Sequence, residues 1–432
     1  MGAFLYSRQI RVMYWLIETE EQINTLERIK YEEAFVEIIP YSNQEHPTQN
    51  EISAIYIRPL KSTKGFMVTI SHSEALSIDI NRVLRVLNTY KKIYTRDKKE
   101  FLHYFILKTL YDITLHPPTY IQNFTQTHQF FTSKYPNKKD VNRIIPIVKH
   151  YEYCENTFSD LKHRINEPIN DFYNNNATMV FNAIERSGVR INREEFEPRF
   201  HTNDSEFVYT QFNFKTLTTR PSNKFKGVNY AALNKENGDR KCFIPRNDFI
   251  FELDISAYHP TLLSHQIGYE FGEGDIHQEF ADMYKVDYKK AKELTFKQLY
   301  GGVFNQYKEL EFFKKTQVYT DDLWAQYQDK GYVECPISKY RYESDKLQDM
   351  NPSKLLNYVL QATETSTNIL ILWDMFKILR GAKTKLILYT YDSFTFDVDK
   401  TEKDKILAII EVFKKYKLKT KMVNGGNYHD MF

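Results

Sequence analysis

The chain has 432 residues, 42% hydrophobic and 27% charged, which is typical of a globular protein with roughly two to four domains of about 150 residues each. A formal net charge of +3 excludes a uniformly basic surface, so a nucleic-acid partner would require local clustering of cations. The three cysteines are few and widely spaced, which suits a reducing compartment. The sequence has neither a secretory signal nor an apolar run near the ~20 residues of a membrane span. These features predict a cytoplasmic protein without a membrane partner.

The first part of the chain mixes strand and helix patterns. Short apolar runs at residues 35–39, 54–57 and 66–70 predict strands, and residues 82–112 predict helices with an apolar face that includes Val83 and Leu87. Residues 138–187 predict two long helices divided near Pro168. The N-terminal region is therefore an α/β domain followed by a helical segment.

The second part returns to strand and loop at residues 206–260 and is mostly helical at 274–330. A long amphipathic helix is predicted from about Ser353 to Leu379. A hairpin follows, with strands at 386–389 and 394–398, and a lysine-rich helix at 403–421 is expected to end the chain.

Two of these segments place an acidic residue at the end of an apolar strand. Asp254 ends the run Phe249-Ile-Phe-Glu-Leu-Asp254, and Asp392 occupies the hairpin turn. Alone, Asp254 could cap the next helix, and Asp392 could be an ordinary turn residue. Together, on adjacent antiparallel strands, the two carboxylates could bind two Mg²⁺ ions, which activate an attacking hydroxyl and stabilise a leaving pyrophosphate.

A third segment combines one cation with two aromatic rings. Lys292, Phe296 and Tyr300 are four residues apart, so they share one helix face. Such a face could bind a triphosphate through lysine and stack a base on the rings. A half-buried amphipathic helix with an outward-reaching lysine explains the pattern equally well.

In chain order, the three segments resemble the polymerase motifs of the family A (DNA polymerase I type) DNA polymerases. Asp254 begins a segment like motif A, Asp-Tyr-Ser-x-x-Glu. Residues 292–301 match Lys-x-x-x-Phe-x-x-x-Tyr-Gly of the fingers helix at every defined position, and Asp392 stands where motif C, His-Asp-Glu, has its aspartate.

Flanking residues agree with this resemblance over about residues 179–432. Residues 216–223 resemble the family's primer-template segment, with Arg220 and Ser222 at matching positions, and Asp275-Ile-His277 resembles the Asp-x-His at the start of the fingers. Arg240 resembles the arginine before motif A, and Asn357 and Gln361 resemble the Asn-x-x-x-Gln pair before motif C.

The resemblance implies a role for each matched residue. Asp254 and Asp392 would hold the metal ions, and Lys292 would contact the incoming triphosphate. The implied nucleotide-binding residues are Ser256, His259, Lys289, Phe296 and Tyr300. The implied primer-template residues are Arg220, Ser222, Arg240, Asn357, Gln361 and Tyr391, and the cations Lys224, Lys226, Lys241 and Arg246 lie near the first of them in the sequence.

Four positions depart from the family pattern. The glutamate that blocks a ribose 2′-hydroxyl is His259 here, so His259 or Tyr258 would form the gate and sugar selectivity is open. Motif C has Tyr391 and Ser393 around its aspartate. Tyr288 replaces an arginine of the fingers helix, and Lys289 or Lys290 could supply that charge.

The implied fold is a multi-domain α/β right-hand polymerase with an N-terminal RNase H-like domain of the 3′–5′ exonuclease type. That domain should be inactive, since Ile39 replaces the second acid of Asp-x-Glu and only Glu37 remains. The expected domains are 1–135 exonuclease-like, 136–205 reduced thumb or connection, 206–265 with 345–432 palm, and 266–344 fingers.

The expected function is template-directed addition of deoxynucleotides to a primer 3′-end in viral or phage DNA replication, in the host cytoplasm if phage-encoded. Primer-template DNA and dNTPs would be partners, two Mg²⁺ ions the cofactor, and a processivity factor or another replisome protein is plausible for so short a chain. Two alternatives stay open: a single-subunit RNA polymerase or primase-like enzyme, and an inactive polymerase-like DNA-binding protein.

Overall fold

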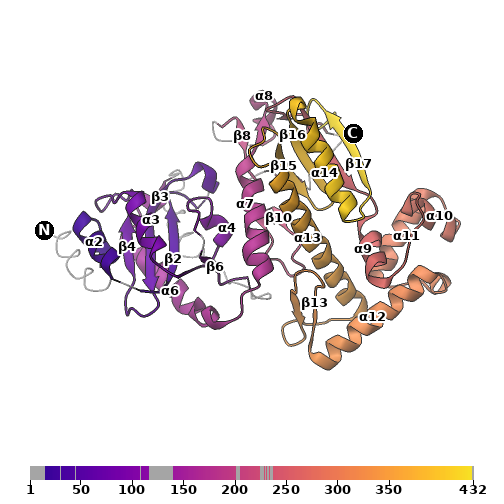
Figure 1. Ribbon diagram of the computed structural model, residues 1–432, viewed down its shortest axis with the longest axis horizontal. Coiled ribbons are helices and arrows are strands. Elements are labelled where there is room, and N and C mark those ends of the chain that lie inside the picture. The colour runs from indigo at the N-terminus through magenta and orange to yellow at the C-terminus, as the bar shows by residue number, and fades with distance from the viewer. Residues whose placement is uncertain are drawn as a thin grey trace. The chain divides into compact units, whose positions relative to one another are not determined.

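The computed structural model describes residues 15–29, 31–43, 45–107, 109–115, 140–200, 205–223, 228, 230, 233 and 237–430. The chain forms two compact units, Met1–Asn182 and Ala183–Phe432 (Figure 1). In the described part of the chain, no helix is long and apolar enough to cross a membrane.

Unit 1 is built on a six-stranded mixed sheet in the order β1-β4-β3-β2-β5-β6. The strands are β1 (Trp15–Ile17), β2 (Glu33–Pro40), β3 (Ile52–Pro59), β4 (Phe66–Thr69), β5 (Lys92–Thr95) and β6 (Leu110–Asp112). β2, β3 and β4 form an antiparallel meander, whereas β5 and β6 extend the sheet from β2 in parallel. The predicted α/β character of this region is confirmed, and the three predicted strands are present as β2, β3 and β4.

Helices cover both faces of this sheet. The main helices are α2 (Glu20–Arg28), α3 (Ile80–Asn88), α4 (Lys98–Phe101) and α6 (Ile147–Leu161). Val36 and Ile55 pack in a cluster with α2 and α3, while their neighbours Phe35 and Tyr56 pack in a second cluster with α6. Successive strand residues point to opposite faces, so the two clusters lie on opposite sides of the sheet.

Short helical turns connect these elements. They are η1 (Pro47–Gln49), η2 (Val141–Arg143), η3 (Lys162–Asn166) and the π-helical η4 (Phe172–Ala177), and α7 (Thr178–Ser187) leads out of the unit. The predicted thumb segment, residues 136–205, thus contains both α6, which packs on the unit 1 sheet, and the boundary between the units. The thumb assignment itself stays a prediction.

Two secondary-structure predictions were wrong. Residues 82–112 contain only one longer helix, α3, because β5 and β6 add to the sheet there. The lysine-rich segment ends its helix at Lys415 and continues as strand β17, which pairs with β12. In both places, pairing with a distant strand overrides a local pattern that is also compatible with helix.

Lys98 is a buried cation in unit 1. It is only 6% exposed, its Nζ lies 3.3 Å from Oδ1 of Asn175, and burial lowers the pKa of its amine from 10.5 to about 8. Between pH 8 and 10.5 the unfolded chain therefore binds more protons than the folded protein does. The free energy of unfolding consequently rises with pH across this window. We expect Lys98→Met to change the free energy of unfolding more favourably at neutral pH than at pH 10.5. The difference between the two changes should be about 3 kcal/mol. Urea denaturation of both proteins at the two pH values measures this; an equal effect at both would contradict it.

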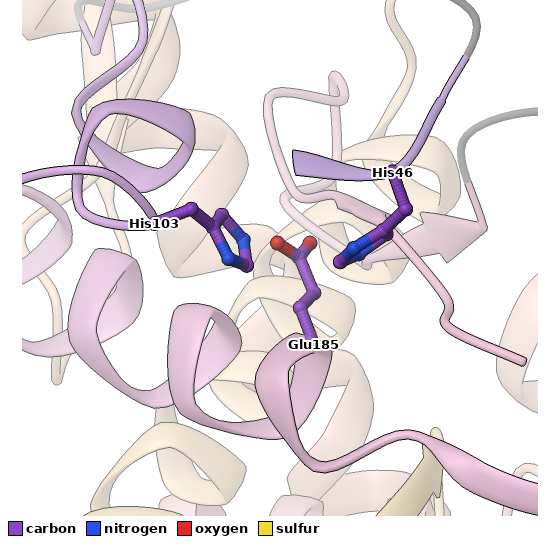
Figure 2. A group of neighbouring side chains, drawn as sticks. All are labelled: His46, His103 and Glu185. Atoms are coloured by element: carbon purple, nitrogen blue, oxygen red, sulfur yellow. The ribbon is translucent and has the colours of Figure 1, made fainter. Parts of the chain in front are cut away.

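Figure 2 shows two neighbouring histidines of unit 1. The rings of His46 and His103 lie nearly perpendicular, with centroids 5.3 Å apart, and Nδ1 of His46 accepts the Thr48 N–H at the start of η1. Glu185, also drawn, belongs to unit 2, where its Oε1 accepts the Phe212 N–H at 2.6 Å. Two imidazoles do not form the oxygen-rich site that Mg²⁺ prefers, so the predicted metal site must be sought at the acidic residues.

Unit 2 has a central four-stranded antiparallel sheet in the order β15-β16-β12-β17. Its strands are β12 (Phe249–Ile255), β15 (Lys385–Thr390), β16 (Ser393–Val398) and β17 (Thr420–Gly425). The smaller strands are β7 (Val189–Ile191), β8 (Phe207–Val208), β9 (Phe212–Asn213), β10 (Ser222–Asn223), β11 (Phe243–Ile244), β13 (Tyr332–Glu334) and β14 (Arg341–Glu343). The predicted hairpin is confirmed as β15 and β16.

The longest helix of the described part of unit 2 is α13 (Pro352–Ile378), which runs beside the hairpin and α14 in Figure 1. The others are α8 (Arg193–Phe196), α9 (Tyr258–Ile267), α10 (Ile276–Tyr284), α11 (Tyr288–Gly301), η6 (Asn305–Tyr307), α12 (Glu311–Lys330), η7 (Lys400–Glu402) and α14 (Lys403–Lys415). Asn351 caps the start of α13 by accepting the Lys354 N–H. Because α13 contacts α9, α11, α12 and α14, its buried face can hold several elements in one arrangement.

Candidate active site

The two predicted acidic residues lie at the same end of two paired strands. In the β12–β16 ladder Asp254 is opposite Ser393, the residue after Asp392. The next residue of β12, Ile255, donates its N–H to the carbonyl of Asp392 at 2.8 Å. Residues 138 positions apart in the sequence are thereby neighbours at one edge of the sheet, as the hairpin prediction required.

Each of the two acids lies close to a residue with a strained backbone. Tyr391, directly before Asp392, has φ 57°, and Ala257, three residues after Asp254, has φ 47°. The left-handed region is unfavourable for residues with a Cβ atom and persists only where the surrounding structure imposes it. Strain at both turns is typical of a site whose geometry is maintained for function.

Asp392 is exposed on the surface, whereas Asp254 is partly exposed. Although Asp392 has exposed surface, the protein packed around the turn partly desolvates its carboxyl and raises its pKa. The charge of Glu364 adds to this rise, while a backbone hydrogen bond and the charges of Arg220 and His259 oppose it. The charged form of a desolvated carboxylate is stabilised by any cation that binds beside it.

The predicted face of α11 is present. The rings of Phe296 and Tyr300 are stacked, with centroids 6.0 Å apart and an interplanar angle of 18°. Lys292 is exposed one turn before Phe296, and its charge lowers the pKa of His277, second to the effect of burial. The His277 ring in turn lies 6.3 Å from Phe296, so the cation and the two rings form one surface.

The start of α11 is held by the preceding helix. Asp275 caps α10, and its Oδ2 accepts the hydroxyl of Tyr288 at 3.3 Å. Lys289 and Lys290 are exposed in the first turn of α11, so either amine is accessible to a ligand. Tyr288 therefore joins the two helices, and the charge expected at its position in the family has to come from the neighbouring lysines.

The two gate candidates point in different directions. The hydroxyl of Tyr258 donates to Oδ1 of Asn368 on α13 at 2.7 Å, and burial raises its pKa well above the usual value. Nδ1 of His259 instead meets the hydroxyl of Tyr300 on α11. His259 contacts the face of α11 that carries Tyr300, whereas Tyr258 is bonded to α13, so His259 is the better gate candidate.

Ser256 lies two residues after Asp254 and three before His259. It is partly exposed, and its N–H donates to the carbonyl of Lys419 at 2.9 Å. Lys419 Nζ also contacts the carbonyls of Glu273 and Gly274, each at 2.7 Å. The segment before β17 therefore links the motif A turn to the loop that leads into α10.

Sequence reasoning missed two polar residues of α13 that organise the site. The side-chain amide of Asn368 donates to the Tyr389 hydroxyl at 2.7 Å and to the Tyr391 carbonyl at 2.8 Å, which fixes the strained turn. Glu364, one turn earlier, is 1% exposed and binds His259 and Arg220. The available signal was the unbroken run of polar residues 363–368, all of them buried, within an otherwise apolar helix.

The Glu364 carboxyl should make stability acid-sensitive. Burial alone would raise its pKa, but hydrogen bonds and charges from His259 and Arg220 outweigh this and lower it below 4.5. Because the pKa of Glu364 is lower in the folded protein than in the unfolded chain, its carboxylate stabilises the fold fully above about pH 4.5. This stabilisation is lost as the pH falls through the pKa of the folded protein. We expect Glu364→Gln to cost about 2 kcal/mol at neutral pH and progressively less below pH 4.5. Urea denaturation across this range measures it; a pH-independent cost would contradict it.

The predicted primer-template residues lie in several places in unit 2. Arg220 stacks on Tyr391, with its guanidinium carbon 4.0 Å from the ring centroid, beside the Asp392 turn. Gln361 donates to Asn357 at 2.8 Å, and both are partly exposed one turn apart on α13. Ser222 is exposed on β10. Arg220 therefore lies at the Asp392 turn, Asn357 and Gln361 lie along α13, and Ser222 lies on a separate strand pair.

The remaining cations near the primer-template segment differ from expectation. Arg240 is 6% exposed, covered by the ring of Tyr428, and donates to the Leu233 carbonyl. Arg246 pairs with buried Asp397 and donates to the carbonyls of Ser187 and Gly188, which is a structural role. Lys241 is exposed, and Lys224 and Lys226 lie outside the described residues. Neither arginine presents a free guanidinium to a phosphate.

In unit 1, the remaining acid of the expected exonuclease motif is paired. Glu37 on β2 is 5% exposed, and its Oε1 lies 2.5 Å from Nε of Arg96. The Arg96 guanidinium is also over the Tyr153 ring at 5.6 Å. A neighbouring arginine competes directly with a metal ion for this carboxylate.

Neither a family model nor a curated protein matches this sequence. Among solved structures, the fold is similar to the POL domain of Pol1 from M. smegmatis, determined in complex with DNA primer-template and dNTP. The TM-score is 0.66 at 11% sequence identity, and the alignment covers 96% of this chain and 98% of that chain. The chain therefore has the mixed α/β fold of a DNA polymerase I polymerase domain.

Proposed function

We propose that the protein is a template-directed DNA polymerase that adds deoxynucleotides to a primer 3′-end. One observation carries the proposal: Asp254 and Asp392 share the end of the β12–β16 ladder, and His259, five residues after Asp254, touches Tyr300 of α11. The helix with a lysine and two stacked rings thus adjoins the paired acids. The fold of the mycobacterial polymerase domain supports this proposal.

The two aspartates suit divalent metal ions. Both offer hard oxygen ligands, and Asp392 is accessible. Desolvation and, to a smaller extent, the negative charge of Glu364 raise the pKa of Asp392, and an added cation would offset both effects. The chemistry that bound Mg²⁺ supplies at such a pair is activation of an attacking hydroxyl and neutralisation of charge on the leaving pyrophosphate. Asp254 and Asp392 would hold these ions, and water and substrate phosphates would complete the ligands.

The protein's own residues would bind and orient the substrates. Lys292, with Lys289, is placed to neutralise triphosphate charge, while Phe296 and Tyr300 offer a stacking surface for a base. Ser256 adds a partly exposed hydroxyl beside Asp254. On the primer side, the contacts are assigned to Arg220, Ser222, Asn357, Gln361 and Tyr391.

The proposal includes no proofreading activity and leaves unit 1 as an exonuclease-like domain without function in hydrolysis. The ion pair between Glu37 and Arg96 supports this assignment, because it neutralises the acid that would otherwise bind a metal ion. A role in phage replication and a processivity partner are further parts of the hypothesis.

A primer-extension assay with labelled primer-template, Mg²⁺ and either dNTPs or rNTPs tests the proposal. Extension with dNTPs supports it, and shortening of the primer without nucleotides would contradict the absence of proofreading. Preferential extension with rNTPs would favour an RNA polymerase or primase-like enzyme, an alternative that His259 at the gate position motivates. Binding of primer-template without extension would identify an inactive DNA-binding protein.

A further inference from the structure

Glu364 is a buried carboxylate with two separate partners. Its Oε2 lies 2.6 Å from Nε2 of His259, and its Oε1 lies 3.2 Å from the Arg220 guanidinium. It comes from the middle of α13, and the sequence motifs do not include it. Burying a carboxylate is costly even when it is paired, so its presence beside the site calls for a role other than stability.

The pairing with Glu364 determines which nitrogen of the His259 ring carries a proton and which one faces Tyr300. Because Glu364 has a lowered pKa and stays ionised at neutral pH, it can only accept, so Nε2 of His259 must carry a proton and donate it. With Nε2 bonded to Glu364, Nδ1 is the ring nitrogen that faces the Tyr300 hydroxyl. Burial raises the pKa of Tyr300 to about 12, so this hydroxyl keeps its proton and can donate.

The same carboxylate serves the primer side. Arg220, bound to the other oxygen of Glu364, stacks on Tyr391, which precedes Asp392. The continuous series Tyr300, His259, Glu364, Arg220 and Tyr391 therefore joins α11 to the metal-binding turn. One acid on α13 supports both a residue at the sugar gate and a residue at the primer terminus.

We propose that Glu364 is a positioning residue for sugar selectivity: it orients His259 and, through His259, holds the Tyr300 hydroxyl at the edge of the nucleotide site. This inference rests on the proposed polymerase function. An unanchored imidazole could rotate away, which would enlarge the space available to a ribose 2′-hydroxyl and loosen nucleotide binding. A buried hydrogen-bonded network of this kind acts as a unit, so breaking either end should have the same effect.

The test is a double-mutant cycle on the full chain, with kcat and KM measured for single dNTP and rNTP incorporation. Glu364→Gln and Tyr300→Phe should each lower the preference for dNTP over rNTP by about 10-fold, mainly through KM, and the double variant should fall no further. The matched control is Glu402→Gln, whose carboxylate accepts the backbone N–H groups of Lys383 and Thr384. It should keep the wild-type preference.

If the losses of dNTP preference in the two single variants add up in the double variant, Glu364 and Tyr300 act independently and the inference is overturned. A change that merely destabilises the fold would give such additive losses, because its effect does not depend on Tyr300. An unchanged preference in Glu364→Gln would also overturn it. Should Glu364→Gln fail to fold, Glu364→Asp keeps the charge but shortens its reach to His259; a wild-type preference in that variant contradicts the inference.

A second measurement separates this inference from the proposed function. Calorimetric titration of dNTP and rNTP into the protein bound to dideoxy-terminated primer-template reports selectivity without catalysis. If wild type fails to extend primers but binds dNTP selectively, and Glu364→Gln loses that selectivity, the inference stands while polymerase activity is refuted. If wild type shows no nucleotide selectivity in either measurement, the inference fails.

Discussion

Asp392→Ala should reduce primer extension by roughly 10³-fold or more while the protein stays folded. Loss of a metal-ligand carboxylate removes several kcal/mol of transition-state stabilisation, and about 4 kcal/mol corresponds to 10³-fold in rate. The fold should tolerate the change, because Asp392 is exposed and its backbone carbonyl, not its side chain, accepts the Ile255 N–H. Single-turnover extension at saturating dNTP measures the effect.

Two controls make this prediction sharp. Asp404→Ala removes an exposed acid from the first turn of α14 in the same unit and should leave the rate unchanged. Asp254→Ala should reproduce the loss, and the double variant should be little worse than either single variant, since the two acids act as one metal site. Extension at a tenth of the wild-type rate by folded Asp392→Ala would refute the assignment.

The parts of the site that lie on regular elements could be predicted from the sequence. Apolar strands ending in Asp254 and Asp392 appear as β12 and the β15–β16 hairpin, and the spacing of Lys292, Phe296 and Tyr300 puts them on one face of α11. Periodicity and turn signals are local, so they remain readable without knowing the fold. The implied metal ligands and substrate contacts remain predictions.

The contacts between elements could not be predicted in this way. Glu364 lies 105 positions from His259 and 144 from Arg220, and no local pattern indicates either pairing. Arg240 resembled a DNA-binding residue in its segment, but Tyr428 covers it near the end of the chain. The predicted helix at 403–421 runs into the start of strand β17, whose partner β12 lies far away in the sequence. In each case, a long-range contact decides the role or conformation of the residue.

The second large effect is expected at the fingers helix. Lys292→Ala should lower kcat/KM for dNTP by roughly 10- to 100-fold, because a charge-assisted contact to phosphate contributes about 1.5–3 kcal/mol. KM should account for much of the loss if the lysine binds the triphosphate in the ground state, whereas a fall in kcat alone would indicate that it acts only in the transition state. Steady-state kinetics with varied dNTP distinguish the two.

Lys297 is the matched control, because it is an exposed lysine on the same helix but five residues away, and therefore on a different face. Lys297→Ala removes the same charge from α11 and should change kcat/KM by less than about 2-fold, since a distant exposed charge is screened by salt. Lys292→Arg should recover part of the lost activity because it restores the charge with a different shape. Equal losses at Lys292 and Lys297 would mean that α11 attracts nucleotide only through its overall charge, and the specific triphosphate contact would have to be abandoned.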